Sequence, residues 1–367
     1  MKIKAAVCRE KDAPLTMEEI ELDDPRPDEV LVKVKYCGIC HTDICMQDQS
    51  IPVPLPAVLG HEGCGIIEQV GADVRGFKPG DPVLMCFDAC GECIACRSGS
   101  PSFCDLSMPL SFGGHRMDGS TTMRKGKEII HGSIFGQSSF ATYSLATARN
   151  LIKLDSEEGM EYFGPLGCGL QTGAGAVINA MRLGMGQTIV IFGVGSVGLS
   201  AVMAAKLVGA SIIVAVDLND EKLKMAKELG ATHAFNPKSV PDIIKAIRET
   251  TGGFGLQFSL DTTGLPQVVR QGVEVLAVQG KCAILGASPM DVEVHLPQMH
   301  MMVTGKHLFG TVEGNSVPQD FIPKLIDQYR KGNFPIDKLA HFYSFDDINQ
   351  ALEDSGKGKI IKGIVKM

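Results

Sequence analysis

The sequence predicts an α/β protein with a mainly β domain and a second domain built on a doubly wound parallel sheet. Up to about residue 165 the chain is rich in glycine, proline and short alternating segments such as 30–36, whose period of two is typical of half-buried strands. After Cys168, apolar runs alternate with helical patterns, which is typical of a parallel sheet with crossover helices. A length of 367 residues also exceeds the size at which one core usually keeps growing.

The elements of the parallel-sheet domain follow one another in a regular order. We expect strands at 188–192, 211–216, 256–260 and 281–285, and helices at 196–208, 220–229, 242–250 and 266–277. Beyond about Leu308 the pattern fades, and two helix candidates remain at 319–330 and 347–354. The expected domains are therefore 1–169, 170–310, and a return of 311–367 to the first domain.

The β-rich half contains one long irregular segment. Turn signals such as Lys78-Pro-Gly-Asp81 separate its expected strands. Residues 105–137 show little periodicity and carry several charges, so we expect a long excursion over the surface.

Charge and composition narrow the function classes. A net charge of -7 and a pI near 5.7 provide no basic face for a general nucleic-acid or anionic-membrane binder. The apolar stretch 188–216 is long enough to suggest a membrane span, but glycines interrupt it, which favours strand, turn, helix and strand. The N-terminus has no secretory apolar run, so we expect a cytoplasmic protein whose 12 cysteines are thiols and metal ligands.

Four cysteines lie close together in the β-rich half, at positions Cys90, Cys93, Cys96 and Cys104. Thiolates at such short spacings can surround one tetrahedral Zn(II) at metal–sulfur distances of about 2.3 Å. Four thiolates leave no open coordination position for a substrate. The sequence therefore predicts a structural zinc site here and places the chemistry elsewhere.

A glycine-rich turn indicates a dinucleotide site. Gly193-Val-Gly-Ser-Val-Gly198, which includes Val197, follows the expected strand 188–192 and opens a helix at Ser196. In such a turn Gly193 makes the bend, Gly195 lets the backbone approach a pyrophosphate at the helix N-terminus, and Gly198 lets helix and strand pack closely. The alternative is a glycine-rich turn in some other α/β protein.

Asp217 follows this turn by about 20 residues, at the end of the next expected strand. Its carboxylate would accept hydrogen bonds from an adenosine ribose and would repel a 2′-phosphate. The next residues, Leu218 and Asn219, supply no compensating arginine. The sequence therefore favours NAD over NADP.

Further candidate metal ligands remain outside the four-cysteine cluster, at Cys37, Cys40, His41, His61 and Cys168. A lone His or Cys is more often a core residue than a ligand. Three of these residues lie in distinctive surroundings: Gly-Ile-Cys-His-Thr-Asp at 38–43, Gly-His-Glu-Gly at 60–63 and Gly-Cys-Gly at 167–169.

The order of these motifs resembles that of the zinc-dependent medium-chain alcohol dehydrogenases, from about Val30 to the C-terminus. Residues 38–43, 58–65 and 167–173 are most similar to the bacterial aryl (benzyl) alcohol dehydrogenases. The resemblance implies a GroES-like first domain, a Rossmann second domain, and a catalytic zinc held by Cys40, His61 and Cys168 with one position open for water or alcohol. Such a zinc acts as a Lewis acid on the alcohol, and the nicotinamide of NAD takes the hydride.

The resemblance also implies roles for residues beside these ligands. Thr42 matches the hydroxyl that contacts the alcohol oxygen and passes its proton on, and His41 matches a contact to the cofactor pyrophosphate. Cys45 stands where many animal and plant relatives carry a relay His, so we expect His41 or solvent to complete the proton transfer. Asp43 and Glu62 resemble carboxylates that support the site, with Asp43 accepting from the His61 ring.

Other residues are implied to bind the cofactor or to line the substrate pocket. Thr172 belongs to the motif at 167–173, Lys222 fits a contact to the adenosine ribose, and Lys362 fits a basic position near the pyrophosphate. An apolar pocket wall is expected from Cys86, Phe87, and Leu110 or Leu285. The ordinary alternatives are a turn-capping role for Thr42, ion pairs for Asp43 and Glu62, and exposed surface positions for Lys222 and Lys362.

The leading hypothesis is reversible, NAD-linked, zinc-dependent oxidation of a primary aromatic or allylic alcohol, with two zinc ions per subunit. Glutathione-dependent formaldehyde oxidation is an alternative that needs basic residues at the pocket mouth, for which Arg116 and Lys125 are candidates. A polyol dehydrogenase ranks lower because Cys168 and the four-cysteine cluster are intact. A non-enzymatic zinc module is the third alternative. A homodimer or homotetramer is expected.

Overall fold

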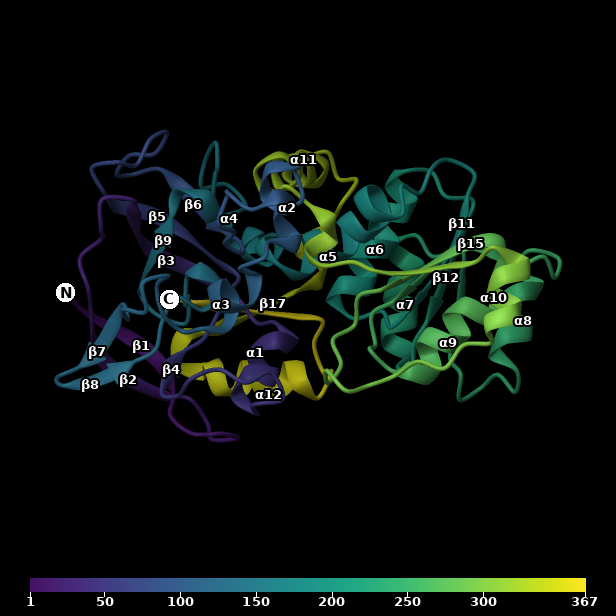
Figure 1. The fold of residues 1–367 in the computed structure, drawn as a ribbon, viewed down its shortest axis with the longest axis horizontal. Coiled ribbons are helices and arrows are strands. Elements are labelled where there is room, and N and C mark those ends of the chain that lie inside the picture. The colour runs from purple at the N-terminus through teal and green to yellow at the C-terminus, as the bar shows by residue number, and fades with distance from the viewer. The chain divides into compact units, whose positions relative to one another are not determined.

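The computed structural model describes all 367 residues, and the chain divides into two compact units (Figure 1). The first unit contains residues 1–169, 317–327 and 336–367, and the second contains residues 170–316 and 328–335. The first unit is mainly β and the second is built on a parallel sheet, so the predicted fold class is confirmed. None of the helices combines the length and apolar character that a membrane crossing requires.

Two sheets form the first unit. One has the order β4-β1-β2-β7-β8, and the other has the order β10-β6-β5-β3-β18-β17 with β9 paired to β3. The strands are β1 (Lys2–Cys8), β2 (Thr16–Leu22), β3 (Glu29–Gly38), β4 (Ala57–Val58), β5 (Gly63–Val70), β6 (Pro82–Met85), β7 (Met123–Lys125), β8 (Glu128–Ile130), β9 (Tyr143–Thr147), β10 (Leu151–Lys153), β17 (Ala340–Ser344) and β18 (Lys362–Lys366). The helices are α1 (His41–Gln47), α2 (Ile94–Arg97), α3 (Ser107–Phe112), α4 (Met160–Phe163) and α12 (Ile348–Gly356).

Strand β3 is the centre of the larger sheet and confirms the strand expected at 30–36. It pairs with β5, β9 and β18, all antiparallel. Its partner β18 comes from the last residues of the chain, so the C-terminus completes a sheet that the N-terminal half begins. Buried apolar side chains of β1, β3, β4 and α12 form one continuous core.

Residues 105–137 differ from the expected surface excursion, and that prediction was wrong. The segment contains α3 and the hairpin β7–β8, and β7 extends the sheet by pairing with β2. Met123, Ile130 and Ile134 are buried in the core. The sequence shows no periodicity because each hairpin strand is only 3 residues long.

The second unit is a six-stranded, entirely parallel sheet of order β13-β12-β11-β14-β15-β16. Its strands are β11 (Thr188–Phe192), β12 (Ile212–Val216), β13 (His233–Phe235), β14 (Leu256–Asp261), β15 (Leu276–Ile284) and β16 (His307–Gly310). The remaining helices are α5 (Gly169–Gly175), α6 (Ser196–Leu207), α7 (Asp220–Leu229), α8 (Ile243–Glu249), α9 (Pro266–Glu274), α10 (Gln298–Thr304) and α11 (Pro318–Arg330). Of these, α6, α7, α8, α9 and α10 flank the sheet in Figure 1, whereas most of α11 belongs to the first unit. The strand order reverses between β11 and β14, which is the switch point where such sheets bind ligands.

The expected strands and helices of this unit are confirmed, with one shift. Strand β15 begins at Leu276, whereas we expected a helix to 277, and α9 ends at Glu274. The apolar run Val275 to Val278 fits either structure in isolation. Pairing of Leu276 with Leu256 in the sheet decides for the strand.

Candidate metal and cofactor sites

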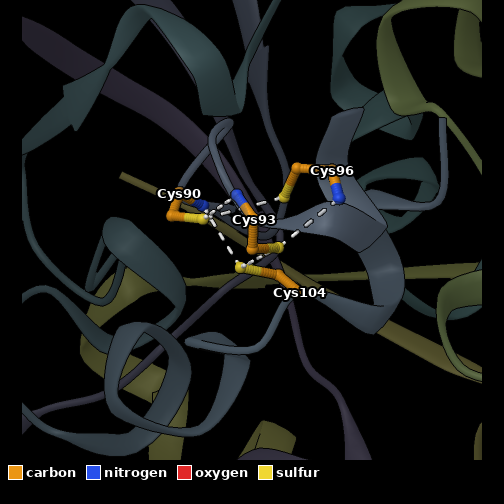
Figure 2. Close-up of side chains that lie close together, drawn as sticks. All are labelled: Cys90, Cys93, Cys96 and Cys104. Carbon is orange, nitrogen blue, oxygen red and sulfur yellow. Dashed lines mark hydrogen bonds between the residues drawn. The ribbon is translucent and has the colours of Figure 1, made fainter. Parts of the chain in front are cut away.

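The four clustered cysteines converge on one point (Figure 2). Their sulfur atoms all lie within 4.8 Å of one another. The Cys90 and Cys96 sulfurs are 3.9 Å apart and the Cys93 and Cys104 sulfurs are 4.0 Å apart. A tetrahedron with metal–sulfur distances of about 2.3 Å has sulfurs about 3.8 Å apart, so the four residues fit one zinc ion.

Backbone N–H groups around this cluster point at the sulfurs. Cys93 and Cys96 donate to the sulfurs of Cys90 and Cys93, each at 3.4 Å, and Cys93 is also the N-cap of the short helix α2. Hydrogen bonds from the backbone of Asp105 and Cys96 lower the pKa of the Cys93 thiol to about 6. The thiolate form that metals bind is therefore stabilised at Cys93, whereas burial raises the pKa of Cys96 to about 12 and also raises that of Cys104.

A second group brings together Cys40, His61, Glu62 and Cys168, whose candidate ligand atoms also lie within 4.8 Å of one another. Cys40 is the N-cap of α1, His61 and Glu62 precede β5, and Cys168 precedes α5. The His61 ring is fully buried, yet its Nε2 atom has no hydrogen-bond partner. An unpartnered imidazole nitrogen between two thiols is a donor set that suits zinc.

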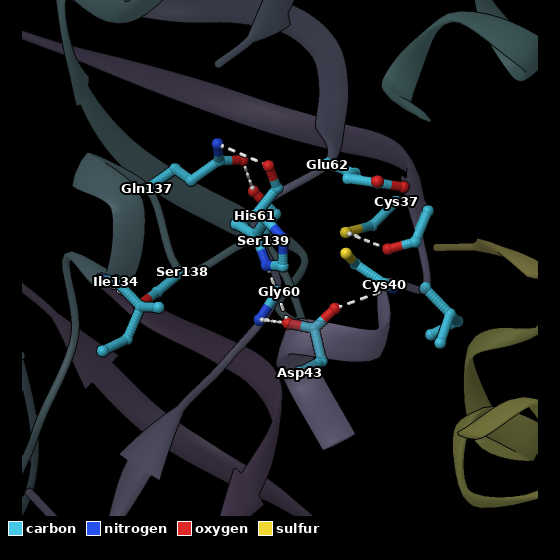
Figure 3. Close-up of polar contacts among 12 residues, drawn as sticks. Cys37, Cys40, Asp43, Gly60, His61, Glu62, Ile134, Gln137, Ser138 and Ser139 are labelled. Atoms are coloured by element: carbon cyan, nitrogen blue, oxygen red, sulfur yellow. Dashed lines mark hydrogen bonds and ion pairs between the residues drawn. The ribbon is translucent and has the colours of Figure 1, made fainter. Parts of the chain in front are cut away.

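Asp43 joins the elements that carry these ligands (Figure 3). Its Oδ1 atom lies 2.9 Å from the His61 Nδ1 atom and accepts from the Gly60 N–H at 3.1 Å. Its Oδ2 atom accepts from the Cys40 N–H at 3.0 Å. A proton on Nδ1 facing this buried carboxylate leaves the Nε2 lone pair available for a metal.

Electrostatics in this group favours a deprotonated Cys40. A hydrogen bond from Cys168 lowers the pKa of Cys40 well below its usual range, and the charge of His61 adds to the effect. Burial acts to lower the pKa of His61, but the negative charges of Asp43 and Cys40 outweigh it and raise that pKa.

Glu62 is paired with a residue from the far end of the sequence. Both of its carboxylate oxygens lie 2.9 Å from the Lys362 Nζ atom, which also donates to the Ile39 carbonyl at 3.0 Å. Burial acts to lower the pKa of Lys362, but the Glu62 charge more than offsets it, so the pKa is raised. Lys362 is 2% exposed, so it is not an exposed surface residue, and its contact with a pyrophosphate stays a prediction.

The other residues predicted around α1 lie on its first two turns. His41 is exposed, Thr42 is half-buried, and a hydrogen bond to Cys45 raises the pKa of His41. Their roles in proton transfer and pyrophosphate binding stay predictions.

Aromatic side chains cover the His61 imidazole. Phe135 stacks on it with ring centroids 4.4 Å apart and planes at 20°, and Phe112 meets the Phe135 ring edge to face. Phe135 was not predicted as a neighbour of His61, because it lies within the segment predicted as a surface excursion.

The second unit holds the glycine-rich turn at the carboxyl end of β11. Gly193 has a φ of +82°, which favours glycine, and a Cβ atom on Gly198 would lie 1.9 Å from the Gly193 carbonyl oxygen. Space around Gly195 is open, and no side chain caps the N-terminus of α6, whose first turn includes Val197. This geometry fits the pyrophosphate of a dinucleotide.

Asp217 follows β12 beside this turn, and its carboxylate accepts hydrogen bonds from the N–H groups of Val194 at 2.8 Å and Asn219 at 2.9 Å. Lys222 is half-buried in the first turn of α7. Thr172 lies on α5, where its hydroxyl donates to Glu313 at 3.1 Å. Contacts of these three residues with a cofactor stay predictions.

Known proteins share both units. Residues 26–156 match the family described as "Alcohol dehydrogenase GroES-like domain", and residues 196–330 match "Zinc-binding dehydrogenase". A geraniol dehydrogenase of Castellaniella defragrans is 42% identical, over 99% of this chain and 97% of that enzyme. The chain belongs to the zinc-dependent medium-chain alcohol dehydrogenases.

Two further relatives match this dehydrogenase over its whole length. The crystal structure of a benzyl alcohol dehydrogenase from Acinetobacter calcoaceticus is 44% identical, covers 100% of this chain and 99% of its own, and superimposes with a TM-score of 0.97. An S-(hydroxymethyl)glutathione dehydrogenase of Saccharomyces cerevisiae is 35% identical over 100% of this chain and 96% of that enzyme.

The family membership confirms the resemblance predicted from the motifs. This dehydrogenase is an enzyme that acts on small-molecule alcohols, and its family binds zinc. The alternative of a non-enzymatic zinc module is excluded.

Proposed function

We propose that this dehydrogenase oxidises a primary aromatic or allylic alcohol to the aldehyde, reversibly and with NAD. The proposal combines the geraniol and benzyl alcohol dehydrogenases among its relatives with the site in the first unit. Cys40, His61 and Cys168 would hold a catalytic zinc, and Cys90, Cys93, Cys96 and Cys104 would hold a structural one. The observation that carries the proposal is the buried His61 Nε2 atom, unpartnered within a group of cysteine ligands.

The residues around the proposed catalytic zinc would each have a defined role in this chemistry. When bound, zinc supplies a Lewis acid that lowers the pKa of an alcohol, and NAD supplies the hydride acceptor. Asp43 holds the His61 ring in the tautomer that the metal needs. The Thr42 hydroxyl, two residues beyond Cys40, would accept the alcohol proton, and His41 or solvent would carry it away.

The choice of NAD depends on Asp217. Its carboxylate stands beside the glycine-rich turn and would accept from the adenosine ribose hydroxyls, while a 2′-phosphate would meet its negative charge. We therefore expect a strong preference for NAD over NADP.

Glutathione-dependent formaldehyde oxidation is the second candidate, favoured by the S-(hydroxymethyl)glutathione dehydrogenase relative. It needs a free cation for a glutathione carboxylate. Arg116 has 8% of its side chain exposed, and its guanidinium group binds Glu29 at 2.6 and 3.0 Å and Asp23 at 3.1 Å. Lys125 is paired with Glu18 at 2.7 Å. Neither cation that the sequence suggested is unpaired, so we favour the simple alcohol.

A rate comparison tests the choice of substrate. Following NADH absorbance, we expect benzyl alcohol and geraniol to be oxidised with a kcat/KM well above that of S-hydroxymethylglutathione. The opposite order would overturn the proposal in favour of the glutathione adduct.

Metal analysis tests the two zinc assignments. We expect two zinc ions per chain. Cys40→Ser should lose one zinc and all turnover while the protein stays folded, and Cys93→Ser should lose the other zinc together with stability. A Cys40→Ser variant that retains both metals would contradict the catalytic assignment.

We also propose a cytoplasmic homodimer or homotetramer. A reducing compartment suits a chain with 12 cysteines that are thiols and metal ligands.

Strand β16 ends the sheet of the second unit with one unpaired edge. Beside it, α10 has no buried residue, and Met299, Met302 and Val303 are each at least 65% exposed. An unpaired edge next to exposed apolar side chains suits contact with a second copy of the chain.

A further inference from the structure

We infer that Gln137 is a positioning residue of the catalytic metal site, holding the main chain around His61 so that the imidazole is set for the metal in advance. The inference rests on the proposed role of Cys40, His61 and Cys168 as zinc ligands. Gln137 touches no ligand atom. It acts through the backbone of His61 and through the residue that follows Glu62.

The Gln137 side chain uses every hydrogen-bonding position of its amide (Figure 3). Its Nε2 atom donates to the carbonyls of His61 at 2.9 Å and Cys86 at 3.2 Å. Its Oε1 atom accepts from the Gly63 N–H at 3.1 Å and from the Ser139 hydroxyl at 2.6 Å. An amide offers two donors and two main acceptor sites, so a flipped orientation would set donor against donor and acceptor against acceptor.

Two of these contacts lie on either side of Glu62, directly after the ligand His61. The bond to the His61 carbonyl and the bond from the Gly63 N–H fix the peptide groups that flank Glu62. Gln137 is 1% exposed, so water does not compete for its bonds. The approach is so close that a Cβ atom on Gly63 would lie 2.2 Å from the Ser139 hydroxyl, which explains the glycine at that position.

The segment that carries Gln137 adopts a strained backbone. Ser133, Phe135 and Ser138 have φ angles of +61°, +53° and +59°, which residues other than glycine rarely adopt. The Ser138 hydroxyl secures the turn, accepting from the Ile134 N–H at 2.9 Å and donating to the Val58 carbonyl at 2.7 Å. Strain that the surroundings enforce in this way is typical of functional sites.

The same strain places the Phe135 ring against His61. Three contacts fix separate parts of His61. Phe135, stacked at 4.4 Å, fixes the plane of the imidazole ring, and Asp43 fixes its Nδ1 atom. Gln137 fixes the main chain of His61 through its carbonyl group. Contacts that orient a metal ligand in this way typically change metal affinity by 10–100-fold when removed. We assign Gln137 and Phe135 to this class.

Zinc release to a chelator tests the inference, with the four-cysteine zinc as an internal reference. Gln137→Glu keeps the shape of the side chain and its acceptors but loses both donors, so it should release one zinc about tenfold faster or more, and leave release of the second unchanged. With Co(II) in place of zinc, the ligand-field spectrum of the catalytic site should change as well.

Asn349→Asp is the matched control, because the Asn349 amide also exchanges two hydrogen bonds with a main chain, that of Leu15, away from the metal ligands. It should release both zinc ions at the wild-type rate. Phe135→Leu, which removes the stacking but keeps an apolar side chain, gives a second variant should Gln137→Glu fail to fold.

Folded Gln137→Glu or Phe135→Leu variants that release the catalytic zinc at the wild-type rate would overturn the inference. A wild-type protein with no zinc at Cys40, His61 and Cys168 would instead refute the proposed function.

Discussion

Asp43 is the single residue that does most to assemble the metal ligands. One carboxylate accepts from the backbone of Cys40, from the backbone of Gly60 and from the ring of His61. It therefore ties the N-terminus of α1 to the loop before β5, which carry two of the three proposed zinc ligands. Because it is fully buried, no water can replace it.

Asp43→Asn should weaken zinc binding at the catalytic site by about 10–100-fold, because the amide carries no charge to hold the Nδ1 proton, and its NH2 group faces the Cys40 N–H when the amide oxygen keeps the other two bonds. Competition with a chelator measures the affinity. Asp48→Asn, at the C-terminal end of the same helix, removes a carboxylate that caps only the Ser50 N–H and should leave zinc binding unchanged. Equal affinities for wild type and Asp43→Asn would contradict the role.

Lys362→Met should destabilise the protein by about 3–5 kcal/mol, because Glu62 would remain buried without its cation. The double change Glu62→Gln with Lys362→Met should recover part of this loss, since neither charge remains. Chemical unfolding of the four proteins measures the coupling. A raised KM for NAD with unchanged stability would instead support the pyrophosphate contact predicted from the sequence.

Strand β2 shows how one carboxylate can join several elements. Glu18 accepts from Arg9, which follows β1, and from Lys125, which ends β7. Hydrogen bonds from Arg9, and then from Lys125 and Thr16, lower the pKa of Glu18 from 4.5 to about 2. The side chain is only 9% exposed.

This pKa shift predicts a difference in acid stability. The folded pKa is lower than the unfolded one, so the stabilisation is fully present above pH 4.5 and is lost as the pH falls towards 2. Wild type should therefore be more stable than Glu18→Gln near neutral pH, and the difference should shrink between pH 4.5 and 2. Urea unfolding of both proteins across that range measures it. A difference that does not vary with pH would contradict the assignment.

Elements with a local signal could be predicted from the sequence. The parallel sheet follows from apolar runs of β11, β12 and β14, and the four-cysteine group follows from the spacing of its cysteines. The grouping of Cys40, His61 and Cys168 was expected from the resemblance to the alcohol dehydrogenases. The short strands of the β7–β8 hairpin could not be predicted, because three residues are too few to show a period of two. They become strands only through pairing with β2, which lies far away in the sequence.

Residues that act through long-range contacts were equally hidden. Lys362 meets Glu62 across 300 positions of sequence, and Gln137 meets His61 across 76. Neither Lys362 nor Gln137 lies in a sequence motif that indicates which residue it contacts. The motifs predicted the candidate ligands and Asp43, which lies in the same motif as Cys40, but they contain no sign of Gln137 or of the pairing between Lys362 and Glu62, which only the fold brings about.

The whole molecule presents exposed apolar side chains that its own fold does not cover. On α10, Met301 packs into the core of the second unit with Leu296 and Leu308, while Met299 and Met302 are each 68% exposed. Burying such side chains stabilises an assembly by about 25 cal/mol for each Å² removed from water. The adjacent edge of β16 adds unpaired backbone groups that a second copy can pair.

Met302→Glu should therefore dissociate the proposed dimer or tetramer towards smaller species, because assembly would bury an unpaired charge. Light scattering with size-exclusion chromatography measures the mass over a range of concentrations. Met185→Glu is the matched control: Met185 is 87% exposed and lies in the loop before β11, which β14 and β15 separate from the edge strand β16, so its replacement should leave the mass unchanged. A wild-type monomer would refute the assembly itself. An assembled wild type whose mass Met302→Glu does not alter would place the contact on another surface, since a carboxylate inserted into an apolar interface cannot be accommodated without loss of affinity.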